Sequence, residues 1–296
     1  MLLVLPEFEM LFADSVEETC VLLSQYGREA EIVAGGTDLF IKMKHKRLIP
    51  RYLINIKRIR GLDQIRYDAG DGLHLGALAT VQSIKDSAVV NKKFPILAQA
   101  AGVLGTTQIR NLGTLGGNLA NASPSAEFGP PLLTLDASVR CLGGAGERLI
   151  SINEFFLSPG KSALKQDEVL TEVQVPDLPP RAQGIYLKHS LRRMDVSMAG
   201  AAVFVLLDGD VCREARIALG AVAPTPFRAT KAEETLIGNK LSGDSVEREL
   251  LDEVARVASG ESLPIDDIRG YASYRTKVVA MLVRDALEQA IARARE

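Results

Sequence analysis

Residues 111–127 read NLGTLGGNLANASPSAE, and three glycines, Gly113, Gly116 and Gly117, stand there among small, hydroxyl and amide side chains. Their spacing fits neither the GxGxxG dinucleotide pattern nor a P-loop, which also requires a lysine. Glycines let a ligand approach the backbone closely, and the short polar side chains around them can donate or accept hydrogen bonds. A tight turn between two elements explains the stretch equally well, so this loop alone does not indicate a binding site.

A second glycine pair lies earlier in the chain, in Ala34-Gly35-Gly36-Thr37-Asp38, between a short apolar run and the helix-forming sequence TDLFIKMK. Glycines at such a junction expose convergent backbone N–H groups, and the start of a helix adds partial positive charge, which suits a phosphate. The alternative is a plain turn in which Thr37 or Asp38 caps the helix. The negative charge of Asp38 disfavours a bare phosphate here, unless the Asp38 side chain caps the helix or accepts a hydrogen bond from a hydroxyl group.

Two such loops in one chain favour a ligand larger than a mononucleotide. The pyrophosphate of a dinucleotide could be held from both sides by two loops with accessible backbone amides. We therefore interpret residues 34–38 and 113–118 together as a site for the pyrophosphate and ribityl region of a large cofactor.

The pattern outside these loops is that of a mixed α and β protein, and 296 residues are enough for two domains. Residues 15–27 show a capping box and a glycine stop, which predict a helix. The apolar runs 31–34 and 51–56 predict strands on either side of a further helix. DAGDG at 68–72 predicts a hairpin, and 184–222 predicts three strands with turns at MD and DGD, followed by helices.

Composition and charge exclude several classes of function. The net charge of −2 argues against broad binding to nucleic acid or acidic membranes, and the basic run 42–47 is typical of a solvated helix end. The opening MLLVLPEFEM lacks the features of a signal peptide or membrane span. The cysteines, Cys20, Cys141 and Cys212, are widely separated, which predicts a reducing compartment, the cytoplasm, and no zinc or iron–sulfur site in this chain.

No pattern for substrate chemistry is present in the sequence. The three histidines, His45, His74 and His189, have no metal-ligand spacing, and the GxSxG pattern of hydrolases is absent. We therefore expect no catalytic residue and no metal ligand in this chain.

Four segments occur in an order and at separations that are similar to those of a known family: IVAGGTDL (32–39), QIRNLGTLGGNLANASPSAE (108–127), YLKHSLRRMD (186–195) and DIRGYASYR (267–275). The chain resembles the FAD-binding medium subunit of the molybdenum hydroxylases, the family of xanthine dehydrogenase, carbon monoxide dehydrogenase and 4-hydroxybenzoyl-CoA reductase. The resemblance extends over nearly the whole chain, and the paired glycine loops are its most specific part.

The resemblance implies an α+β fold in two domains. Residues 1–177 would form a PCMH-type, vanillyl-alcohol-oxidase-like FAD-binding domain with two subdomains, about 1–60 and 61–177. Residues 178–296 would form a C-terminal domain of the CO-dehydrogenase flavoprotein type, with a three-stranded antiparallel sheet and a helical bundle.

The resemblance also implies which residues contact noncovalently bound FAD. The two glycine loops would hold the pyrophosphate, Glu127 would lie near polar groups of the cofactor, and Leu170 and Lys188 would contact the flavin. Tyr186 matches an aromatic that covers the ring in some members, and Leu104 stands where some members have an aromatic. The expected cofactor-binding residues are Ile32, Val33, Ala34, Gly35, Gly36, Thr37, Asp38, Leu39, Leu104, Gly113, Thr114, Gly116, Gly117, Asn118, Glu127, Leu170, Tyr186 and Lys188.

The function implied by the resemblance is electron transfer within an oxidoreductase complex. A large molybdopterin subunit would act on substrate, a small subunit with [2Fe–2S] clusters would pass electrons to FAD on this chain, and NAD, a quinone or ferredoxin would accept them. The complex would be a heterohexamer, a dimer of heterotrimers, with molybdopterin and iron–sulfur clusters only on the partners. The alternatives are a self-contained FAD-dependent reductase of the same superfamily and a non-catalytic assembly module with a flavin-type fold.

Overall fold

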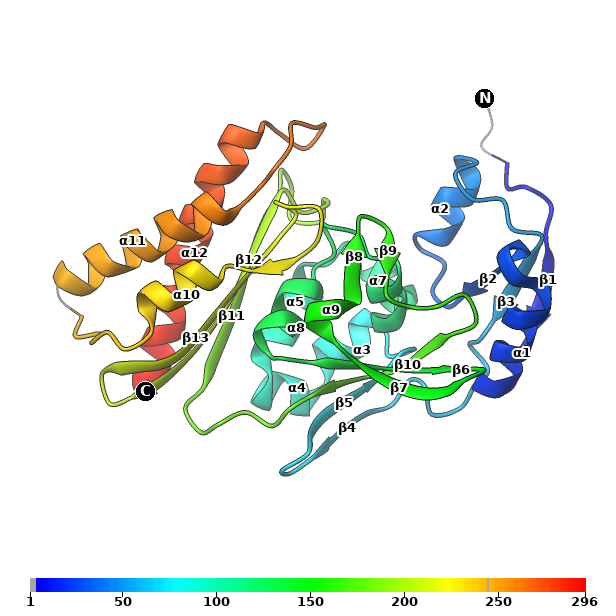
Figure 1. The fold of residues 1–296 in the computed structure, drawn as a ribbon, viewed down its shortest axis with the longest axis horizontal. Helices are drawn as coiled ribbons and strands as arrows, with labels where there is room; N and C mark the ends of the chain where they lie inside the picture. The colour runs from blue at the N-terminus through cyan, green and yellow to red at the C-terminus, as the bar shows by residue number, and fades with distance from the viewer. Residues whose placement is uncertain (1–3, 244) are drawn as a thin grey trace.

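The computed structural model of the protein describes residues 4–243 and 245–296. Its strands form three main sheets, and helices pack against them. The three sheets follow one another along the long axis of the molecule (Figure 1). The N-terminal sheet lies at one end, and the C-terminal helices lie at the other. The mixed α and β architecture expected from the sequence is confirmed.

The first sheet is parallel, with the order β1-β3-β2, and contains the predicted strand–helix–strand unit. Ser15 caps the first helix as predicted, because its Oγ accepts a hydrogen bond from the Glu18 N–H at 3.0 Å, whereas the Glu18 carboxylate accepts from the Asp14 N–H at 2.7 Å and not from Ser15. The sequence did not predict β1, whose four residues are too short to show a period. The elements are β1 (Glu9–Phe12), α1 (Val16–Tyr26), the 3-10 turn η1 (Gly27–Glu29), β2 (Ala30–Val33), α2 (Leu39–Lys44) and β3 (Tyr52–Asn55).

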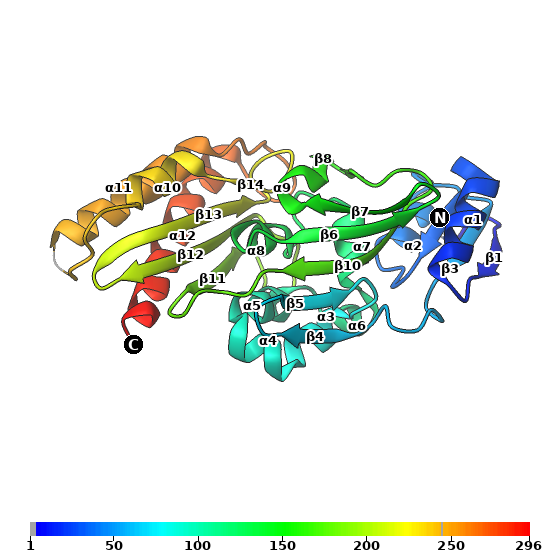
Figure 2. The ribbon, with the colours of Figure 1, turned by 60° about the horizontal axis from the view of Figure 1, so that its bottom comes forward.

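The second sheet is antiparallel, with the order β4-β5-β10-β6-β7, and its first two strands form the predicted DAGDG hairpin. Figure 2 shows this sheet between the other two. The strands of this part are β4 (Ile65–Asp68), β5 (Gly72–Gly76), β6 (Ser138–Gly143), β7 (Gly146–Ser151), β8 (Phe156–Ser158), β9 (Lys161–Ser162) and β10 (Val169–Val175). The helices are α3 (Val81–Asp86), α4 (Ala88–Lys93), α5 (Pro95–Val103), α6 (Thr107–Leu112), α7 (Leu115–Ala120), α8 (Gly129–Thr134) and α9 (Ile152–Phe155).

The third sheet has the order β11-β12-β13-β14, in which three long antiparallel strands are those predicted and β14 adds two residues at one edge. The strands are β11 (Gln183–His189), β12 (Ala199–Asp208), β13 (Val211–Gly220) and β14 (Phe227–Arg228), and the helices are α10 (Thr230–Leu236), α11 (Ser245–Glu261) and α12 (Ala272–Arg295). Within residues 4–243 and 245–296, no helix has both the length and the apolar composition needed to cross a membrane.

Successive side chains of β12 point alternately into two different hydrophobic cores, so this sheet connects the central part of the molecule to the C-terminal helices. Val203 and Val205 belong to the core formed with the C-terminal helices, whereas Ala202 and Phe204 belong to the core of the central part. Because successive residues of a strand point to opposite faces, the sheet is buried on both sides. The strand is therefore apolar along nearly its whole length.

Candidate functional site

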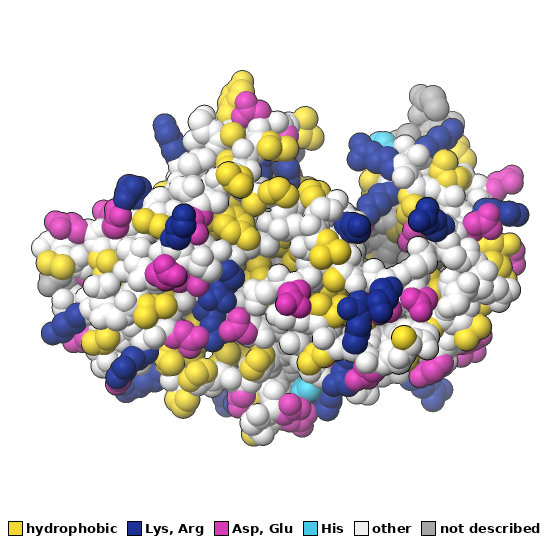
Figure 3. Space-filling model, viewed as in Figure 1, with side chains coloured by type: hydrophobic (Ala, Val, Ile, Leu, Met, Phe, Trp, Pro, Cys, Tyr) yellow, Lys and Arg dark blue, Asp and Glu magenta, His cyan; other side chains and the backbone are white. Residues whose placement is uncertain are grey.

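Both glycine loops face one cavity of about 750 Å³ on the side of the molecule where the space-filling view is hollowed (Figure 3). A cavity of this size is typical of sites for large organic ligands. The predicted binding residues that line it are Ile32, Ala34, Gly35, Gly36, Thr37, Asp38, Leu39, Leu104, Gly113, Thr114, Gly116, Gly117, Asn118, Glu127 and Leu170.

The two glycine loops touch one another, and this contact requires glycine at position 35. A Cβ atom on Gly35 would lie 2.1 Å from the carbonyl oxygen of Leu112, which precedes the second loop. Its neighbour Gly36 has a φ of 73°, in the region that favours glycine. The absence of side chains here therefore brings two segments that are distant in sequence into one cavity wall.

The first loop presents free backbone donors to the cavity. The N–H groups of Gly35, Gly36, Thr37 and Asp38 donate no hydrogen bond to any residue that the structure describes. All four residues line the cavity. Successive free N–H groups form a concave surface that suits the oxygens of an anion.

The second loop differs, because most of its backbone N–H groups are already bonded within the protein. Gly113 donates to the Ile109 carbonyl at 2.7 Å, Gly116 to the Ala77 carbonyl at 2.9 Å, and Gly117 to Thr114 Oγ1 at 3.1 Å. The expectation that both loops offer free amides is therefore met by the first loop alone. The second loop offers close approach and short polar side chains.

One of those side chains has a buried acceptor without a donor. Asn118 Oδ1 is buried and has no hydrogen-bond partner among the described residues, and Asn118 lines the cavity. A buried polar atom without a partner is costly, so a hydroxyl or amine group of a bound ligand would stabilise this arrangement.

Lys188 and Glu127 form a buried ion pair beside the cavity. Lys188 Nζ lies 2.8 Å from Glu127 Oε1 and donates to the Val103 carbonyl at 3.0 Å. The two side chains are 2% and 9% exposed. Burial raises the pKa of the Glu127 carboxyl, whereas the charge of Lys188 acts in the opposite direction. Glu127 lines the cavity, whereas Lys188, its ion-pair partner, is not a lining residue.

Three predicted binding residues do not line the cavity: Val33, Tyr186 and Lys188. Val33 is a buried residue of β2. Tyr186 is only 4% exposed and belongs to the central core, and burial raises the pKa of its phenol well above the usual value. The structure therefore places Tyr186 in the core and not over the cavity.

The cavity also has charged lining residues that were not among the predicted binding residues: Glu31, Lys42, Lys161, Lys165, Glu168 and Asp195. Burial raises the pKa of Glu31, and the charge of Lys42 opposes this shift. The lysines at 161 and 165 reach the cavity because the β8–β9 hairpin and the following segment fold over it. No local sequence pattern marks these positions, since their role depends on tertiary structure.

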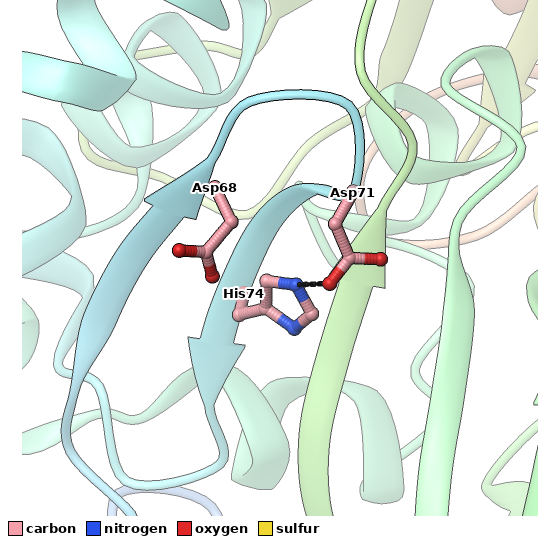
Figure 4. A group of neighbouring side chains, drawn as sticks. All are labelled: Asp68, Asp71 and His74. Atoms are coloured by element: carbon pink, nitrogen blue, oxygen red, sulfur yellow. Dashed lines mark hydrogen bonds and ion pairs between the residues drawn. The ribbon is translucent and has the colours of Figure 1, made fainter.

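A separate cluster of ionisable side chains lies on the β4–β5 hairpin (Figure 4). Potential ligand atoms of Asp68, Asp71 and His74 all lie within 4.8 Å of one another. His74 Nε2 is 2.8 Å from Asp71 Oδ2, and His74 Nδ1 is 3.1 Å from Glu172 Oε1. Arg66 Nη1 donates to Asp68 Oδ2 at 3.2 Å, so a positive charge is already present. We interpret the cluster as an ion-pair network.

Two family models together match most of the chain. Residues 6–178 match the FAD-binding domain in molybdopterin dehydrogenase, and residues 185–290 match the C-terminal domain of CO dehydrogenase flavoprotein. The first model covers both glycine loops. The second model covers β12 and β13 completely and β11 from residue 185 onward.

Similar proteins align with the chain over nearly its full length. The 6-hydroxypseudooxynicotine dehydrogenase complex subunit alpha of Paenarthrobacter nicotinovorans is 35% identical, covering 98% of this chain and 96% of that protein. The carbon monoxide dehydrogenase medium chain of Hydrogenophaga pseudoflava is 32% identical, covering 97% and 98%. A solved structure of carbon monoxide dehydrogenase from that organism superimposes with a TM-score of 0.93, at 33% identity and with 98% and 99% of the two chains covered. The chain therefore belongs to the FAD-binding medium subunits of the molybdenum hydroxylase family of oxidoreductases.

Proposed function

We propose that this chain is the electron-transfer subunit of a multi-subunit molybdenum hydroxylase. It would hold FAD noncovalently between the [2Fe–2S] clusters of a small partner subunit and an acceptor such as NAD⁺, a quinone or ferredoxin. Flavin supplies the ability to take up electrons singly and release them in pairs, and the protein supplies binding, orientation and electrostatics. The substrate would be oxidised on a large molybdopterin subunit.

The observation that carries this proposal is the convergence of both glycine loops on one cavity large enough for a dinucleotide. The free N–H groups of residues 35–38 fit the pyrophosphate oxygens, and the unpartnered Asn118 Oδ1 fits a hydroxyl group of the ribityl or ribose part. In this assignment the first loop binds the negatively charged pyrophosphate, and the second loop, which lacks bulky side chains, lets the cofactor approach the backbone closely.

The side chains around the cavity favour a role in binding FAD and not in catalysing a reaction on a substrate. Among the lining residues that the structure describes there is no His, Cys or Tyr; the groups that could act as acids, bases or nucleophiles are carboxylates, lysines and the hydroxyls of serine and threonine. A self-contained reductase needs its own proton donor close to the flavin. Glu127, a buried carboxylate in the wall, is paired with Lys188.

The proposed partners are a large molybdopterin subunit and a small [2Fe–2S] subunit in a dimer of heterotrimers. Support comes from two relatives that this chain matches end to end, one named a medium chain and one named a subunit of a dehydrogenase complex. The free, buried thiols of Cys20, Cys141 and Cys212 support a reducing compartment, so we place the complex in the cytoplasm.

The visible absorbance spectrum of the purified chain tests the proposal, with chromatography of the cofactor released on denaturation. We expect intact FAD without iron–sulfur absorbance, and no turnover of an organic substrate by the chain alone. A chain that stays colourless after reconstitution with FAD would support the assembly-module alternative. Unaided reduction of a substrate with NADPH would support the self-contained reductase.

A further inference from the structure

One segment of the chain covers the cofactor cavity without belonging to either glycine loop. We call residues 159–168, which connect β8 to β10 and contain β9, the covering segment. Most of its residues line the cavity. Figure 1 shows this part of the chain reaching from β9 toward the N-terminal sheet. The segment therefore supplies a further wall of the site, which no glycine pattern in the sequence marks.

Hydrogen bonds hold the covering segment on both sides of the cavity. On one side the Gly160 N–H donates to the Ala122 carbonyl at 2.9 Å, just beyond α7, which begins within the second glycine loop. On the other side Gln166 Nε2 donates to the Gly27 carbonyl at 3.1 Å, and Gly27 lies shortly before β2, which leads into the first glycine loop. The segment is therefore attached next to both glycine loops.

A bidentate ion pair fixes the end of the covering segment. Arg148 Nε and Nη2 each donate to one carboxylate oxygen of Glu168 at 2.7 Å, and Nη2 also donates to the Ala163 carbonyl at 2.7 Å. The Lys165 N–H donates to Glu168 Oε2 at 2.8 Å. Bidentate pairs of this kind are among the strongest in proteins. The segment is therefore in place before a ligand binds, which lowers the entropy cost of binding.

The covering segment brings two lysines to the cavity, Lys161 and Lys165, whose ammonium groups are available to a ligand. The Lys161 side chain forms no ion pair or hydrogen bond with any residue in the described part of the chain. Lys165 Nζ lies 3.7 Å from Glu168 Oε1, which is longer than a hydrogen bond, and that oxygen already accepts from Arg148. Figure 3 shows Lys and Arg side chains beside the hollow.

Most carboxylates of the cavity wall already have another cation beside them. Glu127 and Glu168 each pair with a cation that does not line the cavity. Burial raises the pKa of Glu31 and of Asp38, and for both groups the charge of Lys42 opposes this shift. The positive charges of the covering segment are therefore not needed to balance these acidic groups.

We propose that Lys161 and Lys165 are the counter-ions of the FAD pyrophosphate and give the site its preference for ligands with a diphosphate. This inference rests on the proposed function. The free N–H groups of residues 35–38 can donate hydrogen bonds to the pyrophosphate oxygens, but they carry no net charge. A lysine ammonium is a compact charge with three donors, which suits a phosphate oxygen. The first glycine loop and the covering segment thus contact the diphosphate from different walls of the cavity.

The test measures the affinity of the full-length apoprotein for FAD and for ADP, which contains a diphosphate but no flavin. Lys161→Gln and Lys165→Gln should each weaken the binding of both ligands about fivefold, and the double variant about 25-fold. The midpoint of thermal unfolding of the apoprotein should stay the same, because neither ammonium group makes a hydrogen bond within the described part of the chain. Lys92→Gln is the matched control, since Lys92 is an exposed lysine of α4 that does not line the cavity.

Charge provides a second, independent measurement. The double glutamine variant should bind FAD with less dependence on ionic strength than wild type, because two screened charge interactions are lost. Lys161→Arg/Lys165→Arg keeps both charges and should retain most of the affinity.

If the double glutamine variant binds FAD and ADP as wild type does, the inference is wrong. It is also wrong if the affinity for FAD falls while that for ADP is unchanged, because the lysines would then act on the flavin and not on the diphosphate. A wild-type chain that takes up no FAD would instead overturn the proposed function, and this inference with it.

Discussion

Lys188 Nζ lies 2.8 Å from Glu127 Oε1, and this buried ion pair joins β11 of the third sheet to the segment that follows the second glycine loop. The pair thus couples the C-terminal part of the chain to the wall of the cofactor cavity. Burial by itself raises the pKa of the Glu127 carboxyl, so the ionised form depends on the charge of Lys188.

Replacing Lys188 with methionine should destabilise the fold, because it leaves the Glu127 carboxylate buried without a counter-charge. Loss of one partner of a buried pair costs about 3–5 kcal/mol in the free energy of unfolding. Urea denaturation at neutral pH measures the change. The double variant Lys188→Met/Glu127→Gln should recover much of this loss, since it removes the uncompensated charge. Equal destabilisation of the single and double variants would contradict the explanation.

Replacing Gly117 with valine should weaken FAD binding while the protein stays folded. A Cβ atom at this position would lie 2.9 Å from Thr114 Oγ1, so the Thr114 side chain must shift slightly, and outside the neighbouring turns of α7 it would meet no other atom within 4 Å. A larger side chain therefore extends toward the cavity that Gly117 lines. Equilibrium dialysis against FAD should show a loss of at least about tenfold, with the midpoint of thermal unfolding of the apoprotein little changed. Gly260→Ala on α11 is the control, because nothing lies within 4 Å of an added Cβ there.

Gly36 makes a useful contrast to Gly117. Its φ of 73° strains any other residue, and a Cβ atom would lie 2.5 Å from the Phe40 ring. A valine at this position should therefore lower both stability and FAD affinity. If Gly117→Val and Gly36→Val both hold FAD as wild type does, the glycine loops are turns and not a binding site.

The sequence predicted elements with strong local patterns and missed those that depend on distant pairing. The three long strands of the third sheet and the DAGDG hairpin were predicted from their period and turn residues. The hydrogen bond of the Gly116 amide was not foreseen, because its acceptor, the Ala77 carbonyl, belongs to a separate segment. The contact of His74 with Glu172 joins residues 98 positions apart, which no spacing rule along the chain reveals.

Motif matching and physical placement also gave different information about the site. The resemblance placed Tyr186 and Lys188 at the cofactor, but both lie on the same face of β11, two residues apart, and neither lines the cavity. Conversely, Lys161 and Lys165 line the cavity although no motif marks them. Both glycine loops line the cavity, and there the need for close backbone approach is visible in a single residue type.

Replacing Asn118 with alanine should separate cofactor binding from stability. Asn118 Oδ1 has no donor among the described residues, so its removal deletes no hydrogen bond of that atom from the apoprotein. Apoprotein stability should stay the same or rise slightly, whereas the affinity for FAD should fall by about 1–3 kcal/mol through loss of a buried acceptor. Fluorescence titration with FAD and thermal unfolding without it measure the two quantities. A large loss of apoprotein stability with unchanged affinity would assign Asn118 a purely structural role.

Asp267 should make the free energy of unfolding depend on pH in the acid range. Its Oδ2 accepts from Arg269 Nε at 2.9 Å and from Arg275 Nη1 at 3.3 Å, and these contacts lower the pKa of the carboxyl from 3.8 to about 2. A carboxyl with a lowered pKa stabilises the fold above its unfolded-state pKa, and this contribution disappears as the pH falls toward the folded-state value.

Denaturation curves measured between pH 5 and pH 2, an interval of about three units around these pKa values, should therefore show Asp267→Asn to be less stable than wild type at the upper end. The difference should shrink as the pH falls, because protonation removes the same charge from the wild-type protein. Asp63→Asn is the control, since Asp63 is exposed and no ion pair of its side chain is seen among the described residues. A constant difference across the range would mean that Asp267 acts through packing alone.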